Sequence, residues 1–135
     1  CLNLKHRLVY NGDIFSENDF YACMKKFPEI NHWMLGRGIL MNPFLPSEIR
    51  GIFNTPAEKL EKLKEFHQRI FELYSEKMDN EGNVLNKMKE FWIYFSYVFP
   101  NQHKHLKWIK KSGSLNKYIN ETQKIFRDYN ISANA

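Results

Sequence analysis

Cysteine is scarce and long apolar runs are absent, and each shortage excludes a class of protein. Two cysteines, Cys1 and Cys23, occur in 135 residues, which fits neither a disulfide framework nor a metal-site spacing. We expect both to be reduced thiols in a cytoplasmic protein. No apolar stretch approaches the roughly 20 residues that span a bilayer, and the start CLNLKHRL lacks the apolar core of a signal peptide. The sequence therefore predicts no membrane partner.

Acidic residues are scarce in the last third of the chain. Residues 83–127 carry 9 Lys or Arg against 2 acids, residues 1–56 carry 6 against 5, and residues 57–82 carry 5 against 7. Hydrophobic residues make up 43% and aromatics 16%, enough for a packed core. A basic, aromatic-rich segment indicates a polyanionic partner, nucleic acid first. The alternative is a solvated helix face with its tryptophans in the core.

The first 51 residues have the pattern of a β–loop–α–β unit. A strand is expected at about Arg7–Tyr10, a helix capped by Ser16 at Glu17–Lys26, and a second strand at His32–Leu35. The two strands should be parallel with a right-handed crossover. Parallel sheets need cover on both faces, so further structure is expected on the N-terminal side, and the start at Cys1 rather than Met agrees. The helix residues expected to face a core are Phe20, Cys23, Met24 and Phe27.

Helical patterns dominate the rest of the chain. A short helix or turn is expected within residues 42–51, and Thr55-Pro56-Ala57-Glu58 is a capping box that begins a long helix reaching about Met78. Three more helices are expected after it, joined by short connections, and together the four should form an antiparallel bundle. Their expected ranges are Val84–Phe99, Asn101–Lys111 and Leu115–Tyr129.

Two glycine-bearing segments each follow one of the expected strands. Asn11-Gly12-Asp13 follows the first, and the tight turn Gly36-Arg37-Gly38 follows the second, 25 positions later. Alone, the first is a common turn sequence, and Arg37 can either clamp a phosphate or pair with a surface carboxylate. Adjacent parallel strands would bring the two segments side by side, which favours a shared phosphate site.

These residues also carry a family resemblance. VYNGDI at residues 9–14, followed by a helix and HWMLGRGILMNPFL at residues 32–45, resembles the end of the flavin-binding barrel in tRNA-dihydrouridine synthases. VLNKMKEFWIYFSYVFP at residues 84–100 resembles the basic helix of the helical tRNA-binding domain in that family. The resemblance implies FMN as cofactor, NADPH as reductant and tRNA as substrate, with uridine reduced to 5,6-dihydrouridine.

The resemblance also implies roles for individual residues. The expected contacts to the FMN phosphate are Asn11, Gly12, Asp13, Gly36, Arg37 and Gly38. The expected tRNA-binding residues are Lys87, Lys89 and Trp92, to which the basic segment adds Lys104 and Lys107. The catalytic cysteine of the family lies in an Asn-x-Gly-Cys motif that does not occur in these 135 residues. No catalytic residue is therefore expected in this chain. No metal ligand is expected either, because His67, His103 and His105 show no metal-like spacing.

The resulting prediction is a mostly α chain made of two parts. Residues 1–51 would be the last two βα units of a TIM barrel, and residues 55–131 a four-helix, tRNA-binding bundle. The parent enzyme is expected to be a monomer, and this chain alone to be inactive and to dimerise or exchange strands through residues 1–50. Two alternatives stay open: a stand-alone helical RNA-binding module, or the end of another FMN- or phosphosugar-binding barrel.

Overall fold

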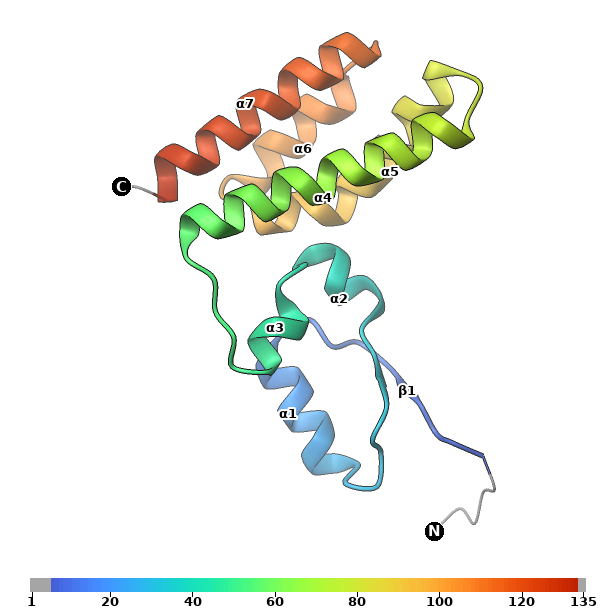
Figure 1. Cartoon of the computed structure of the whole chain (residues 1–135), viewed down its shortest axis with the longest axis vertical. Helices are drawn as coiled ribbons and strands as arrows, with labels where there is room; N and C mark the ends of the chain where they lie inside the picture. The colour runs from blue at the N-terminus through green and yellow to red at the C-terminus, as the bar shows by residue number, and fades with distance from the viewer. Residues whose placement is uncertain (1–5, 134–135) are drawn as a thin grey trace. The chain divides into compact units, whose positions relative to one another are not determined.

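The structure is a computed structural model that describes residues 6–133 and divides into two compact units, residues 1–52 and residues 53–135 (Figure 1). In the described part, seven α-helices and two very short strands account for most of the chain. The prediction of a mostly α protein is confirmed. Cys1 lies outside the described residues, and Cys23 is a half-buried free thiol.

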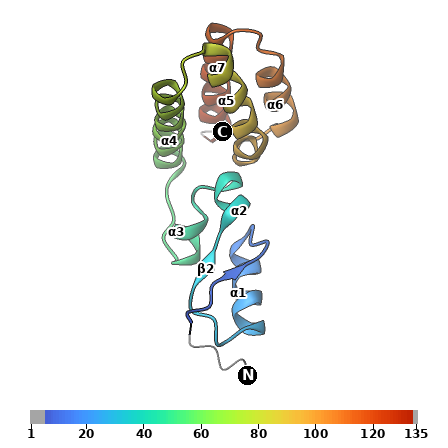
Figure 2. The ribbon, with the colours of Figure 1, turned by 90° about the vertical axis from the view of Figure 1, so that its right-hand side faces the viewer.

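Unit 1 begins with two strands that pair in parallel and are connected by one helix (Figure 2). Strand β1 (Tyr10–Asn11) pairs with β2 (Trp33–Met34), with Tyr10 opposite Trp33 and Asn11 opposite Met34. Helix α1 (Glu17–Lys26) connects them and begins at Ser16 in a capping box with Asp19. The parallel pairing and the helix bounds agree with the sequence prediction. The strands are shorter than expected, since a two-stranded sheet has no further neighbours to extend its ladder.

The predicted Gly36-Arg37-Gly38 turn is wrong in one respect, because these residues form the first turn of a helix, α2 (Gly36–Met41). The following Ile-Leu-Met run supports a helix, and neither glycine has a positive φ angle. The second short helix, α3 (Leu45–Ile49), falls within the expected 42–51 segment. It is followed by Gly51, whose φ of 73° is the left-handed conformation that glycine adopts without strain.

The core of unit 1 is small. Ile14, Phe44 and Leu45 are buried, but α1 buries no residue completely, so its expected core positions are only half-buried, and Met24 is exposed. Around the strands, Leu8, Val9 and Met34 are 43%, 51% and 50% exposed. A parallel pair with uncovered apolar side chains fits the expectation that the sheet needs further partners. Dimerisation or strand exchange through residues 1–50 stays a prediction.

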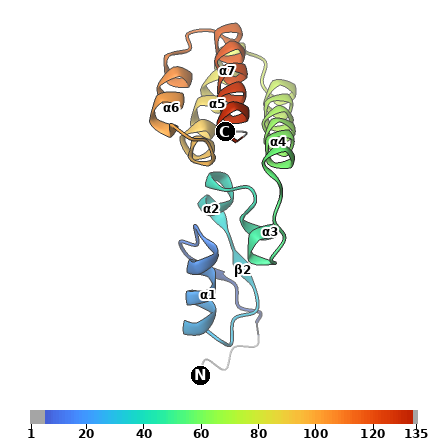
Figure 3. The same cartoon turned by 90° about the vertical axis from the view of Figure 1, so that its left-hand side faces the viewer.

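Unit 2 contains four longer helices, and α4 contacts both α5 and α7, while α6 packs on α5 and α7 (Figure 3). Their bounds are α4 (Pro56–Lys77), α5 (Glu81–Phe95), α6 (Gln102–Lys111) and α7 (Leu115–Ala133), with a 3₁₀ turn, η1 (Ser96–Val98), between α5 and α6. The expected capping box at Thr55 is present. Helix α5 begins three residues earlier than expected, because the Asn80 side chain accepts a hydrogen bond from the Gly82 N–H.

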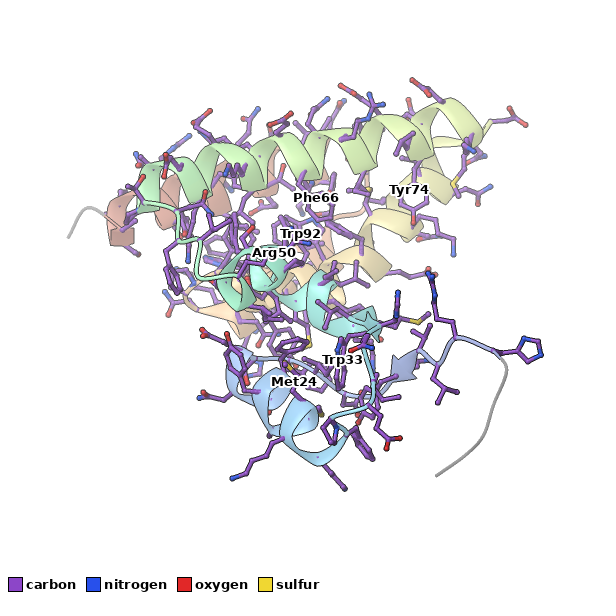
Figure 4. All side chains as sticks on the ribbon, turned by 60° about the horizontal axis from the view of Figure 1, so that its bottom comes forward. Met24, Trp33, Arg50, Phe66, Tyr74 and Trp92 are labelled. Atoms are coloured by element: carbon purple, nitrogen blue, oxygen red, sulfur yellow. The ribbon has the colours of Figure 1, made fainter. Side chains whose placement is uncertain are left out.

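Aromatic side chains fill the core of unit 2. Trp92, Phe95 and Tyr118 are fully buried, and Phe66 of α4 packs edge to face against Phe95 of α5. Figure 4 labels Phe66 and Trp92. Stacked and T-shaped pairs of this kind add to the apolar burial that holds helices together. The core also contains His67, whose Nε2 lies 2.5 Å from the Tyr118 hydroxyl.

The described helices and side chains also limit two other kinds of site. No helix among the described residues is long and apolar enough to cross a membrane. Within residues 6–133, no group of three or more His, Cys, Asp or Glu side chains is arranged to hold a metal ion.

Candidate functional site

A pocket of about 360 Å³ lies in unit 1 where the two strands end. Its lining comes from the two glycine-bearing segments, which the parallel register of β1 and β2 places at the same end of the sheet. Eight residues line it: Asn11, Gly12, Asp13, Ile14, Phe15, Gly36, Arg37 and Gly38. The structure thus brings together all six residues that the sequence singles out for a phosphate, and adds Ile14 and Phe15.

Arg37 is held at this pocket by two contacts. Its Nη2 donates a hydrogen bond of 2.6 Å to Oδ1 of Asp13, and its guanidinium lies 5.9 Å from the ring centroid of Phe15. The Arg37 and Asp13 side chains are 58% and 62% exposed, so the ion pair contributes at most about 1 kcal/mol to stability. Its main effect is to orient the guanidinium. Of the two alternatives for Arg37, the structure shows the carboxylate pair, and phosphate binding stays a prediction.

The two glycines that flank Arg37 have different surroundings. A Cβ placed on Gly38 would lie 2.0 Å from the carbonyl oxygen of Ile14, so two backbone segments meet where no side chain fits. A Cβ on Gly36 would meet no atom within 4 Å, so this side of the pocket is open to a ligand. The N–H groups of a first helical turn have no carbonyl partner within the helix, and the α2 N-cap, Leu35, provides no side-chain cap. The pocket can therefore offer a guanidinium, an amide and backbone donors to an anion.

The phenolic ring of Tyr10 packs against Gly12, one of the residues that line the pocket. A Cβ on Gly12 would lie 2.4 Å from the Tyr10 hydroxyl, which shows how closely the ring covers this glycine. A hydrogen bond between Cys23 Sγ and the Tyr10 hydroxyl, 3.7 Å long, is the largest of the effects that raise the pKa of Tyr10. Phe15, which lines the pocket, could have been identified from its position beside the Asn11–Asp13 segment.

The residues expected to bind tRNA lie on two helices of unit 2. On α5, Lys87 donates to Glu90 at 2.8 Å, and this hydrogen bond raises the pKa of Lys87. Lys89 follows two positions later, about 200° further around the helix, so the two lysines do not share a face. On α6, Lys104 and Lys107 are both exposed and three positions apart, so they do share one.

Trp92 does not lie on the surface of unit 2. It is 0% exposed, and its Nε1 donates a hydrogen bond of 2.9 Å to the hydroxyl of Tyr118 in the core. An RNA has no access to this side chain in the folded unit. The prediction that Trp92 contacts tRNA is therefore corrected, and the alternative of a core tryptophan holds for it.

A groove between α4 and α7, of about 950 Å³, was not anticipated from the sequence. Its lining includes the core residues His67 and Tyr118 and rim residues such as Lys64 and Arg127. Burial lowers the pKa of His67 to about 4 and raises the pKa of Tyr118, so both side chains are neutral at physiological pH. In the sequence, the groove is indicated only by His67, a histidine within the apolar face of α4.

Comparisons with known proteins identify the family of this chain. The family model described as "Dihydrouridine synthase (Dus)" matches residues 2–131. The curated protein "tRNA-dihydrouridine(47) synthase [NAD(P)(+)]" of Candida glabrata is 30% identical over 99 residues, which cover 70% of this chain and 15% of that protein. No solved structure shows significant similarity to the chain. The match over nearly the whole length shows that this chain belongs to the dihydrouridine synthase family.

Proposed function

We propose that this chain is the end of the FMN-binding barrel and the following tRNA-binding domain of a tRNA-dihydrouridine synthase. The parent enzyme would reduce uridine in tRNA to 5,6-dihydrouridine, with NADPH as reductant. The family match over residues 2–131 supports this reading, and so does the name of the Candida glabrata relative. The single observation that carries the site assignment is the pocket lined by both glycine-bearing segments.

The pocket residues fit a phosphate group in kind and in space. Arg37 offers a guanidinium, Asn11 an amide, and the open side at Gly36 admits a ligand oxygen close to the backbone. Asp13 carries the same charge sign as a phosphate, and its bond to Arg37 gives it an orienting role instead. A pocket of about 360 Å³ accommodates a phosphate and adjoining polar atoms of a ligand tail.

The flavin, when bound, would supply the hydride that reduces the uracil double bond. The residues of this chain would hold its phosphate: Arg37 by paired hydrogen bonds, Asn11 through its amide, and Gly36 by leaving room for close approach. No Asn-x-Gly-Cys motif occurs in the 135 residues, so the proton for the uracil ring would come from outside this chain. We therefore expect no uridine reduction by the chain alone.

Unit 2 would bind the tRNA backbone through lysines of α5 and α6. Lys87 and Lys89 lie on separate sides of α5, and Lys104 and Lys107 on one exposed face of α6. Such contacts act through phosphate neutralisation and are largely independent of sequence. Because the segment 83–127 has 9 basic residues and 2 acidic ones, its net charge favours a polyanion over a protein of mixed charge.

The test uses the complete parent protein and one charge in the pocket. Arg37→Ala should lower FMN retention during purification and reduce the dihydrouridine content of tRNA. Arg50→Ala is the matched control, because Arg50 is an exposed arginine of the same unit that does not line the pocket. Equal FMN retention in both variants would contradict the proposed contact between Arg37 and the FMN phosphate. Salt-dependent tRNA binding without any flavin would favour a helical RNA-binding module, and flavin binding without tRNA affinity would favour a different barrel.

A further inference from the structure

One face of α6 combines lysines with an accessible aromatic ring. Lys104, Lys107, Trp108 and Lys111 are spaced i, i+3, i+4 and i+7, so they lie on the same side of the helix. The opposite side carries His105 and Ile109, which are buried. The three lysines are exposed, and Trp108 is half-buried, in contrast to the fully buried Trp92. The Lys104 ammonium lies 4.6 Å from the centroid of the Trp108 ring.

Helix α7 lies beside α6 and also carries lysines. The two helices contact each other, and Nε2 of His105, on the buried side of α6, lies 3.4 Å from Oδ2 of Asp128. The residues at positions 117, 121, 124 and 128 repeat at helical spacing on the Asp128 side of α7, and two of them are exposed lysines. We call this surface the α6–α7 edge; it consists of Lys104, Lys107, Trp108, Lys111, Lys117 and Lys124.

The two acids that share the helical row of Lys117 and Lys124 on α7 already have a partner. Glu121 accepts a hydrogen bond of 3.0 Å from Lys124, and Asp128 is next to His105. In the described part of the chain, Lys107, Lys111 and Lys117 have no carboxylate within ion-pair distance. The edge is thus strongly positive around a ring that is only partly covered.

We propose that the α6–α7 edge binds RNA with an unpaired nucleotide stacked on Trp108. This rests on the tRNA-binding part of the proposed function and specifies which form of RNA the surface takes. A base would replace the Lys104 ammonium over the indole ring, and that ammonium would turn to the adjoining phosphate. Continuous duplex RNA keeps its bases stacked and offers only phosphate and sugar groups. The surface therefore fits a loop or a single-stranded segment better than a helix.

The proposal also assigns to Trp108 the RNA contact that the sequence analysis predicted for Trp92. Trp92 has no exposed surface, whereas Trp108 lies among three lysines of its own helix. Lys87 and Lys89, by contrast, lie on different sides of α5, and the tryptophan of that helix, Trp92, is buried. On α6, exposed lysines and a half-buried indole ring lie together on one helix face.

The experiment compares RNA binding by the full chain and by variants at position 108. Trp108→Leu keeps an apolar side chain but loses stacking, and it should weaken binding of tRNA and of a short single-stranded oligoribonucleotide by about fivefold or more. Trp108→Phe should restore most of the affinity. Tyr97→Leu is the control, since Tyr97 is an exposed aromatic on η1, 54% accessible and not on the edge. The affinity for a blunt RNA duplex of equal length should change little in either variant at position 108.

Tryptophan fluorescence separates stacking from a merely structural role. Single-stranded RNA should quench part of the emission of the wild-type chain, and this part should be missing in Trp108→Phe although that variant still binds. Salt-dependent tRNA binding that is unchanged in Trp108→Leu would overturn the stacking proposal and leave the proposed function in place. A wild-type chain with no affinity for either RNA would overturn both the stacking proposal and the tRNA-binding role, while FMN retention by the parent protein would still report on the pocket.

Discussion

The indole N–H of Trp92 donates a hydrogen bond of 2.9 Å to the phenolic oxygen of Tyr118, and both side chains are completely buried. The same oxygen lies 2.5 Å from Nε2 of His67. One hydroxyl therefore joins α4, α5 and α7 in the middle of the aromatic core. Buried polar groups that satisfy one another in this way are costly to leave unpaired.

Tyr118→Phe removes this shared hydroxyl with little change in volume. The Trp92 N–H and the His67 ring would then lack their partner, and the free energy of unfolding should fall by about 1–3 kcal/mol. Urea denaturation followed by circular dichroism measures the change. Tyr97→Phe removes a hydroxyl from an exposed ring and should leave the urea midpoint unchanged. Equal midpoints for the two variants would show that the buried node does not stabilise unit 2.

His67 gives the stability of unit 2 a defined pH dependence. Burial lowers its pKa from 6.5 to about 4 in the folded protein, so below pH 6.5 the unfolded chain binds a proton that the folded chain does not. Stability should then decrease as the pH falls from about 6.5 towards about 4, by about 1.4 kcal/mol per pH unit. His67→Gln should flatten this part of the profile. His105, whose pKa burial also lowers, remains in both proteins and cancels from the comparison.

The sequence predicts those features of this fold that depend on neighbouring residues. Ser16 and Thr55 form capping boxes where the local pattern places them, and α1 has the expected bounds. Features set by distant partners were missed. Trp92 and Trp108 both lie in amphipathic helices, but Trp92 is buried against Tyr118, 26 positions away, whereas Trp108 is only half-buried. The pocket residues were found because parallel pairing of two strands predicts their proximity, whereas the helical state of Gly36–Gly38 depends on the packing of α2.

Gly38→Ala tests the close backbone approach beneath the pocket. The new Cβ would lie 2.0 Å from the Ile14 carbonyl oxygen, a backbone atom that cannot rotate away, so unit 1 should lose about 1–3 kcal/mol. Hydrogen exchange at the Tyr10 amide, which donates to His32 at 2.9 Å, reports on this unit. Gly36→Ala is the control, since its Cβ meets no atom within 4 Å. Undiminished protection of Tyr10 in Gly38→Ala would show that the contact is not needed for strand pairing.

The lysines of α6 should contribute more to RNA affinity than those of α5. Lys104 and Lys107 share one exposed face, so replacing both with alanine should remove about two phosphate contacts and reduce the salt slope of tRNA binding by about two. Replacing Lys87 and Lys89 should have a smaller effect, because Lys87 is paired with Glu90 and the two side chains point apart. Arg69→Ala, an exposed arginine on α4, is the control for general loss of charge. Filter binding of tRNA across a range of salt concentrations measures all three slopes. A larger effect of the α5 pair would move the RNA-binding surface from the α6–α7 edge to the exposed side of α5.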